Sequence, residues 1–310
     1  MLTPTGTEMG QGLYTKMVQI ASQELGVPVD AIFTQDTTTY QTANASPTAA
    51  SSGSDLNGMA VKDACDQLNA RLKPIREKYG PNAPMKTIAH AAYLERIDLS
   101  AHGFWKMPKI GYEWGNYDPK TTKPMYYYFT QGVASSEVEL DVLTGDHTVL
   151  RTDIKMDIGR SINPAIDYGQ IEGAFIQGQG LFTIEESLWL QNGQLATKGP
   201  STYKIPGFRD IPQQFNVSFL RDVPGSWKGL RSIQSSKGIG EPPVFLGATV
   251  LFALREALKS AREDNKITDK LVLDSPATVE RLRLLVGDEL LKRGTVVPED
   301  GEKNYFVNVE

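Results

Sequence analysis

The chain has 310 residues, 40% of them hydrophobic and 22% charged, which are values typical of a globular protein. Its net charge of -5 and its scattered Lys and Arg residues give no reason to expect nucleic acid as a partner. A single cysteine excludes an intramolecular disulfide, and three histidines without ligand spacing argue against a protein-ligated zinc site. Without a signal peptide or a long apolar stretch, we expect a cytoplasmic chain that binds no membrane.

The first half of the chain is predicted to be mainly helical. Apolar residues recur at helical spacing from Leu13 to Leu25 and predict a helix that ends near Gly26. Ala31 to Thr39 is rich in β-branched residues and predicts a strand. A second helical pattern starts at Leu56 and is expected to end at Pro74, because proline interrupts helices. Residues 79–124 are mostly a connection, with a short helix over about 87–96.

The second half mixes strands and helices. Alternating residues around Thr144-Gly145-Asp146 predict a β-hairpin, and Asn192-Gly193 predicts a second one. Residues 167–186 have helical spacing but many glycines, which usually let another backbone or a ligand come close. A strand is predicted over 214–220 and a helix from Pro243 to about Arg262. A last helix is expected to open at Ser275-Pro276, with the serine as its cap.

These elements predict an α+β fold of mixed helices and β-hairpin sheets. The chain has no repeated βαβ rhythm and no internal sequence repeat. We expect residues 1–295 to form the body of the molecule, with a division into two α+β lobes near 80–125 left open. The polar residues 296–310 are expected to be a peripheral tail.

Four segments combine glycine or small residues with polar groups at the ends of regular elements. They are residues 6–12, 46–55, 169–180 and 237–243. Exposed amides at helix starts favour anions, and the amides of Gln11, Gln170 and Gln177 could both donate to and accept from a heterocycle. No segment matches a phosphate-binding loop, so tight turns or close helix packing remain the favoured interpretation of each segment taken alone.

Glu241 is the strongest single candidate for a functional residue. Two prolines fix the backbone after it, and Gly238 and Gly240 free the backbone before it. One interpretation is a carboxylate that stabilises a helix N-terminus by about 0.3–1 kcal/mol. The other is a general base held rigidly at the rim of a cleft, which would need burial to be tuned for proton transfer.

Six segments, in the same order, resemble segments of the xanthine dehydrogenases and oxidases, within the molybdenum hydroxylase superfamily. They are GTEMGQGLYTKM, NASPTAASSGSDLNG, LTGDHTVLRTDIKMDIGRSINPAIDYGQIEGAFIQGQGLFTIEE, GPSTYKIPGF, SKGIGEPPVFL and LDSPATVERLR. The similarity covers nearly all of residues 6–290. The resemblance implies the C-terminal part of the molybdopterin-binding domain, with the fold of the aldehyde oxidases and xanthine dehydrogenases.

The resemblance also implies a function and a set of site residues. Glu241 would be the base in the hydroxylation of purines, hypoxanthine to xanthine and xanthine to urate, at a molybdenum-molybdopterin cofactor. Ala49 and Ala50 would line a narrow slot for the flat purine, with the main chain of Ala50 next to the molybdenum. Positions that match cofactor-holding residues are Met9, Gly10, Gln11, Ala50, Ser51, Gln170 and Gly240, with Gln177 adjacent to them. In the alternative interpretation, which assigns them no function, these are ordinary loop and turn residues.

Departures from the family pattern limit what the chain can do by itself. The family usually has a histidine and a glycine before GTEMG, where this chain has Pro4 and Thr5. The [2Fe–2S] and FAD regions and the first half of the molybdenum domain would lie in missing N-terminal portions, supplied in cis or in trans. The resemblance implies that the full enzyme is a homodimer.

Two alternatives stay open beside the purine hydroxylase. The first is an aldehyde oxidase-type hydroxylase, against which PTAAS at 47–51 and GEPP at 240–243 argue. The second is a catalytically inert truncated fragment. Whether NAD or oxygen accepts the electrons would be decided in the flavin region.

Overall fold

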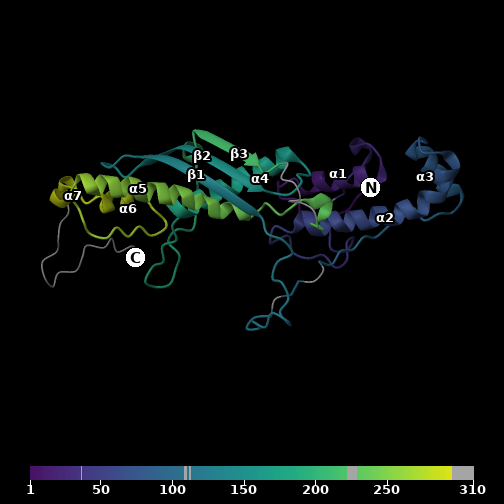
Figure 1. Cartoon of the computed structure of the whole chain (residues 1–310), viewed down its shortest axis with the longest axis horizontal. Helices are drawn as coiled ribbons and strands as arrows, with labels where there is room; N and C mark the ends of the chain where they lie inside the picture. Colours follow the sequence, from purple (N-terminus) through teal and green to yellow (C-terminus); the bar gives the residue numbers. More distant parts are fainter. Residues whose placement is uncertain (36, 108–109, 112, 222–228, 295–310) are drawn as a thin grey trace. The chain divides into compact units, whose positions relative to one another are not determined.

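The computed structural model describes residues 1–310 except 36, 108–109, 112, 222–228 and 295–310 (Figure 1). The chain forms two compact units, neither of which is continuous in sequence. Unit 1 comprises residues 1–131, 157–170 and 220–241, and unit 2 comprises 132–156, 171–219 and 242–310. The lobe boundary expected near 80–125 stays a prediction, and the expected tail at 296–310 lies outside the described residues.

Unit 1 is built on three helices. Helix α1 (Leu13–Leu25) ends at Gly26, whose φ of 66° is left-handed, as the sequence predicts. It lies alongside α2 (Gly53–Tyr79) (Figure 1), and the two helices bury a shared core. Helix α3 (Met85–Leu94) packs on the far part of α2. Core side chains between α1 and α2 are Leu13, Met17, Ile20, Ala21, Val61 and Cys65.

Two expectations for unit 1 are wrong. Helix α2 does not end at Pro74 but continues to Tyr79, because Leu72 and Ile75 on either side of the proline are buried against α3. This packing outweighs the one hydrogen bond that proline cannot donate. Ala31 to Thr39 forms no strand in its described residues. A 3-10 turn at Val29–Ala31 is followed by a single bridge between Leu2 and Thr34. Because the segment pairs with another backbone at this one position, it does not form a longer strand.

Unit 2 contains a three-stranded sheet of order β1-β2-β3. Strands β1 (Gln131–Leu140) and β2 (His147–Asp157) are neighbours joined at Gly145, where a hairpin is predicted. Strand β3 (Gln214–Phe219), also predicted, pairs with β2 in parallel. The second predicted hairpin is a short one, with a single antiparallel bridge from Trp189 to Leu195. Together with the helices, the sheet gives the expected α+β fold.

Helix α5 and the part of helix α4 that belongs to unit 2 cover one face of the sheet. The Phe175 ring of α4 (Pro164–Thr183) lies 5.4 Å from the Phe215 ring of β3. The Thr249 hydroxyl of α5 (Ala248–Asp264) lies 2.7 Å from the Ser136 hydroxyl of β1. The core includes the fully buried residues Ile154, Met156, Ile171, Phe175, Val250 and Leu254.

The glycines of α4 allow a backbone to approach it, as the sequence predicts. A Cβ at Gly178 would lie 1.9 Å from the carbonyl oxygen of Val244, and one at Gly247 would lie 2.4 Å from the amide nitrogen of Gln179. The neighbouring backbone is a 3-10 helix, η4 (Pro242–Gly247), which replaces the first turn of the helix predicted from Pro243. Close packing therefore accounts for part of the glycine content.

The C-terminal helices are short. Helix α6 (Val279–Val286) is capped by Thr278, whose hydroxyl accepts from the Arg281 amide. The predicted cap, Ser275, is wrong, because its hydroxyl donates to the Leu181 carbonyl instead. Helix α7 (Glu289–Gly294) follows, and a further 3-10 turn is Phe208–Asp210. In the part of the chain that is described, no helix has the length and hydrophobicity that crossing a membrane requires.

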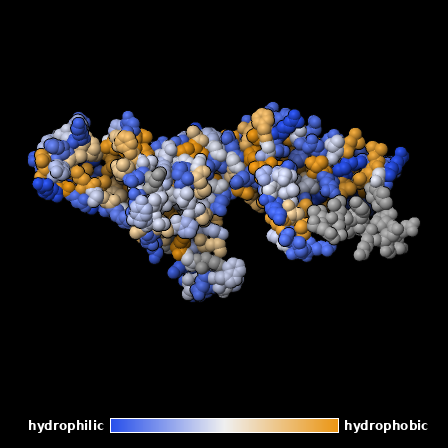
Figure 2. Space-filling view, turned by 180° about the vertical axis from the view of Figure 1, so that it is seen from behind, coloured by the Kyte–Doolittle hydropathy of each residue, from blue (hydrophilic) through white to orange (hydrophobic). Residues whose placement is uncertain are grey.

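Many large hydrophobic side chains lie on the surface. Figure 2 shows hydrophobic residues scattered among the hydrophilic ones. Among the described residues, Phe208 is the most exposed of them, at 91%, and Phe245 is exposed at 74%. Apolar side chains that are scattered singly over a protein surface are normal and do not by themselves indicate an interface.

Candidate functional site

A strained turn precedes α2 in unit 1. The amide and the hydroxyl of Ser52 both donate to the Ala49 carbonyl, at 3.3 and 3.0 Å. The two residues between them have left-handed backbones, with φ of 56° at Ala50 and 54° at Ser51. This conformation costs a non-glycine residue about 1–2 kcal/mol, and such strain is concentrated at functional sites. Ala49 and Ala50 are exposed, so the turn presents small side chains and backbone to its surroundings.

Ser51 and Glu241 form a reciprocal pair, although 190 positions separate them. The Ser51 hydroxyl accepts from the Glu241 amide at 2.8 Å and donates to Oε2 of the Glu241 carboxyl group at 2.8 Å. A Cβ at Gly240 would lie 3.1 Å from the same hydroxyl oxygen. The structure thus brings together Glu241, Gly240, Ser51 and the alanine turn. Glu241 itself is exposed, so the described residues do not enclose it as a buried base would require.

The loop before α1 is held by Glu8, which the sequence reasoning missed. The Glu8 carboxylate accepts from the amides of Gly10 at 3.0 Å, Gly12 at 3.1 Å and Tyr14 at 2.9 Å. The start of α1 was predicted as a place for an anion, and a carboxylate of the chain itself fills that role. An acidic residue just before a glycine-rich helix start was the available signal.

Gln11 and Met9 lie in the same loop. The Gln11 amide group donates to the Thr7 carbonyl at 2.9 Å and accepts from the Met9 amide at 2.7 Å. Its hydrogen bonds in the structure therefore shape the loop, and the Met9 side chain is left 68% exposed. The Thr7 amide donates to the Thr48 hydroxyl at 2.8 Å, so this loop lies against the segment that leads into the alanine turn.

Asp55, Tyr128 and Gly238 form a second link that the sequence did not reveal. The Tyr128 hydroxyl donates to Oδ2 of Asp55 and accepts from the Gly238 amide at 2.7 Å. Burial raises the pKa of Asp55 to about 6, against the opposing effects of the Tyr128 hydrogen bond and the Lys16 charge. Burial also raises the pKa of Tyr128, and the Asp55 charge adds to this rise. Oδ1 of Asp55 is buried without a hydrogen-bond partner.

A buried ion pair lies behind this link. The Lys16 ammonium group of α1 is 2.6 Å from Oδ1 of Asp167 in α4, and both side chains are at most 8% exposed. The Ser161 hydroxyl donates to the other carboxylate oxygen at 2.6 Å. Each buried charge is therefore compensated, as burial requires.

The two remaining glutamine candidates lie on α4. Gln170 is half-buried in unit 1, and among the described residues it forms no hydrogen bond with the turn or with Glu241. Gln177 is exposed and belongs to unit 2.

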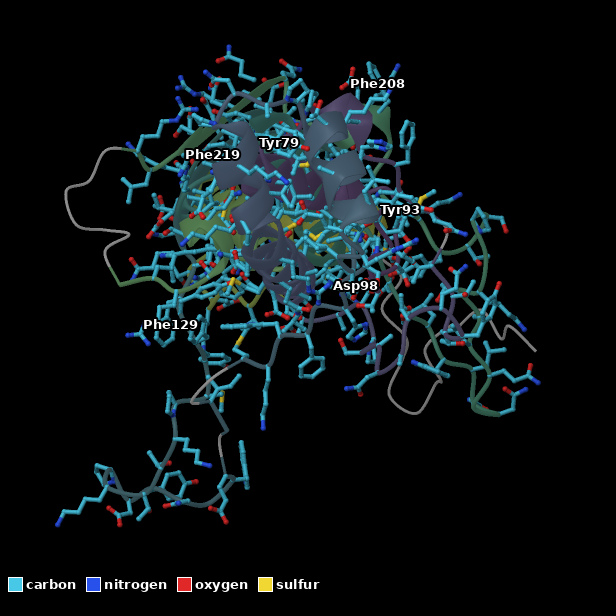
Figure 3. All side chains as sticks on the ribbon, turned by 90° about the vertical axis from the view of Figure 1, so that its right-hand side faces the viewer. Tyr79, Tyr93, Asp98, Phe129, Phe208 and Phe219 are labelled. Atoms are coloured by element: carbon cyan, nitrogen blue, oxygen red, sulfur yellow. The ribbon has the colours of Figure 1, made fainter. Side chains whose placement is uncertain are left out.

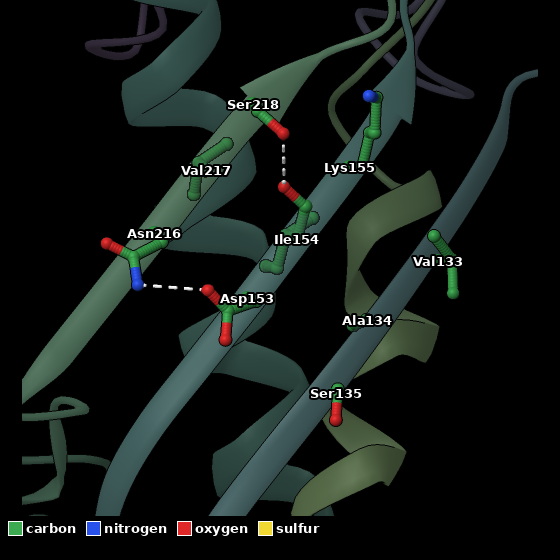
Figure 4. Close-up of a pocket in the computed structure, with 9 residues that line it drawn as sticks. All are labelled: Val133, Ala134, Ser135, Asp153, Ile154, Lys155, Asn216, Val217 and Ser218. Atoms are coloured by element: carbon green, nitrogen blue, oxygen red, sulfur yellow. Dashed lines mark hydrogen bonds between the residues drawn. The ribbon is translucent and has the colours of Figure 1, made fainter.

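Neither a metal cluster nor the sheet cavity coincides with the predicted residues. Within the described ranges, no group of three or more His, Cys, Asp or Glu residues could hold a metal ion. Burial raises the pKa of Cys65 to about 11, which is typical of a core thiol rather than a nucleophile. A cavity of about 280 Å³ lies on the sheet between Asp153, Asn216 and Ser218 (Figure 4), with no predicted site residue among those lining it.

Comparison with known proteins points to one group. Residues 1–212 match the family model described as molybdopterin cofactor-binding domain. Nicotinate hydroxylase hnxS of Emericella nidulans is 68% identical over 100% of this chain, which covers 22% of that protein. A xanthine dehydrogenase of the same organism is 59% identical over 98% of the chain and is also covered to 22%. The chain thus spans about a fifth of the length of these relatives.

Solved structures show the same fold at low sequence identity. CO dehydrogenase from Oligotropha carboxidovorans superposes with a TM-score of 0.71 at 19% identity, over 94% of this chain and 35% of that one. Quinoline 2-oxidoreductase from Pseudomonas putida gives a TM-score of 0.71 at 23% identity, over 92% and 36%. The expected fold is confirmed by these likenesses.

Proposed function

Because the chain belongs to the molybdopterin cofactor-binding domain family, we propose that it supplies the base and part of the cofactor site of a larger molybdenum hydroxylase. The observation that carries this proposal is the pair of hydrogen bonds between Ser51 and Glu241. They hold a carboxylate beside a strained turn of exposed alanines. A general base must lie within reach of the proton that it removes, and the hydrogen bonds to Ser51 hold the Glu241 carboxyl group in one place.

The residues present fit a molybdenum–pterin group. Protein ligands for a metal are lacking among the described residues, which suits a metal that arrives already held by an organic ligand. A Cβ at Gly10 would have nothing within 4 Å, so the loop around Met9, Gly10 and Gln11 leaves room for a ligand to lie against it. When bound, the group supplies the oxygen-transfer and redox chemistry. Met9, Gly10, Gln11, Ala50, Ser51, Gln170 and Gly240 are the residues that we propose hold it.

Glu241 would act as the base, and three neighbouring residues would orient it or admit the substrate. Glu241 takes up a proton as the substrate carbon is hydroxylated, and the Ser51 hydroxyl keeps its carboxyl group oriented. Ala49 and Ala50 extend only a methyl group from the turn, so a planar ring can approach closely. An electron-poor aromatic heterocycle is the substrate class that fits.

We propose a purine as the substrate, with the conversion of hypoxanthine to xanthine and of xanthine to urate. The 59% identity to a xanthine dehydrogenase supports this choice. A second candidate is a pyridine carboxylate, favoured by the 68% identity to a nicotinate hydroxylase. Turnover of hypoxanthine and nicotinate, compared as kcat/KM, separates the two, and activity on aldehydes alone would overturn both.

This chain spans 22% of the length of its relatives, so we propose that the complete enzyme contains further portions. We propose that [2Fe–2S] and FAD groups in N-terminal portions, in cis or in trans, carry the electrons away, and that the enzyme is a cytoplasmic homodimer.

Glu241→Gln in the complete enzyme tests the base. Glutamine keeps the size and can still accept from Ser51, so we expect intact molybdenum content with turnover lowered at least about 100-fold, within the range of general base catalysis. Glu256→Gln, at a largely exposed carboxylate of α5, is the matched control and should leave turnover unchanged. Near-normal turnover in Glu241→Gln would rule out the base assignment.

A further inference from the structure

The segment from Gly238 to Glu241 is tied to the rest of unit 1 at both ends. Ser51 binds the Glu241 end through the amide and the carboxyl group. At the other end, the Gly238 amide donates to the Tyr128 hydroxyl at 2.7 Å, and the Gly238 carbonyl accepts from the Thr130 hydroxyl at 3.0 Å. Both polar groups of one glycine are therefore held by side chains of the segment that leads into β1.

Tyr128 is partly buried, unlike the residue that follows it. Its neighbour Phe129 lies at the surface (Figure 3) and is 68% exposed. The Tyr128 hydroxyl instead reaches the Gly238 amide, at 2.7 Å. A Cβ at Gly238 would lie 2.7 Å from the Ser51 carbonyl oxygen and 3.3 Å from the Tyr128 hydroxyl, which shows how tightly the three residues meet.

Asp55 anchors the tyrosine. It lies in the first turn of α2, four residues after Ser51, and accepts from the Tyr128 hydroxyl. The charged and titratable groups around Asp55 are Tyr128 and Lys16 of α1, and Lys16 is itself paired with Asp167 of α4. The start of α2 thus contacts the Gly238–Glu241 segment twice, through Ser51 directly and through Asp55 by way of Tyr128.

We propose that Tyr128 is a positioning residue for the base Glu241, acting through the Gly238 peptide. Its hydroxyl sets where the segment begins, and Ser51 sets where it ends, so the carboxyl group is held relative to the alanine turn. The inference rests on the proposed function, since it assigns to Tyr128 a role in the work of Glu241. It adds a residue 113 positions before the base, which no local motif connects to it.

Tyr128→Phe in the complete enzyme is the test. The variant keeps the ring but loses both hydrogen bonds, and a small misplacement of a reacting group lowers turnover by about 10- to 100-fold. We expect that fall in kcat with KM and molybdenum content within about twofold of the parent, since substrate and cofactor contacts are untouched. Amide hydrogen exchange at Gly238 should become faster, an effect that does not depend on activity.

Companion variants separate the explanations. Tyr126→Phe, at a residue 59% exposed, is the matched control and should change neither kcat nor exchange. Asp55→Asn still offers an oxygen to the tyrosine and should retain kcat, whereas Asp55→Ala should resemble Tyr128→Phe. If Tyr128→Phe does not fold, Thr130→Val removes the other tether in an isosteric way, and unchanged kcat and exchange in it would overturn the inference.

The result for Glu241→Gln distinguishes the two proposals. An inactive Glu241→Gln with wild-type kcat and Gly238 exchange in Tyr128→Phe would overturn the positioning role and leave the base in place. Full activity in Glu241→Gln would remove the base and the positioning role together. Loss of molybdenum from Tyr128→Phe, with KM raised in parallel, would also overturn positioning, because it would show a general structural role.

Discussion

Gly178→Ala probes the backbone contact between α4 and η4. The new Cβ would lie 1.9 Å from the Val244 carbonyl oxygen and 2.9 Å from the carbonyl carbon, far inside van der Waals contact. The obstacle is backbone, so α4 and η4 must separate. Overpacking of this kind costs about 1–3 kcal/mol or more, against a gain of about 0.5–1 kcal/mol from replacing a helical glycine. We expect net destabilisation of unit 2.

Gly173→Ala supplies the opposite case in the same helix. A Cβ at Gly173 meets nothing within 4 Å, so only the helix-propensity gain remains and the variant should be more stable by about 0.5–1 kcal/mol. The assay is the thermal unfolding midpoint, with amide hydrogen exchange over residues 171–183 to localise the effect. If both alanine variants raised the midpoint equally, the reasoning about close packing would be refuted.

Two further predictions concern the buried charges of unit 1. Burial raises the pKa of Asp55 from 3.8 to about 6, so this carboxyl group favours folding most below pH 3.8 and loses that contribution as pH rises through about 6. Asp55→Asn should therefore be more stable than the parent above pH 6, by up to about 3 kcal/mol. Urea unfolding should show that the difference in unfolding free energy between variant and parent is larger at pH 7.5 than at pH 5. A pH-independent difference would contradict this. Lys16→Met leaves the Asp167 carboxylate buried without its ion-pair partner and should cost about 3–5 kcal/mol of unfolding free energy. The double variant Lys16→Met/Asp167→Asn should recover part of that loss. Strictly additive losses in the same unfolding assay would show that the two residues are not coupled.

The sequence by itself determined the local structure where one signal acted alone. The limits of α1, the turn at Gly145 and the strand over residues 214–219 follow from apolar period and turn residues, which depend on neighbours in the chain. Resemblance to a family marked Glu241, Ser51 and the alanine turn. It identified these residues without showing that they touch.

Tertiary structure decided everything that depends on distant partners. Helix α2 passes Pro74 because α3 buries the residues around it, and the strand expected after Ala31 is absent from the described residues because little backbone lies beside it. The link from Asp55 through Tyr128 to Gly238 joins three segments that are far apart in sequence. A hydrogen bond between residues that are distant in sequence forms only once packing has brought them together, so no local pattern of side chains predicts it.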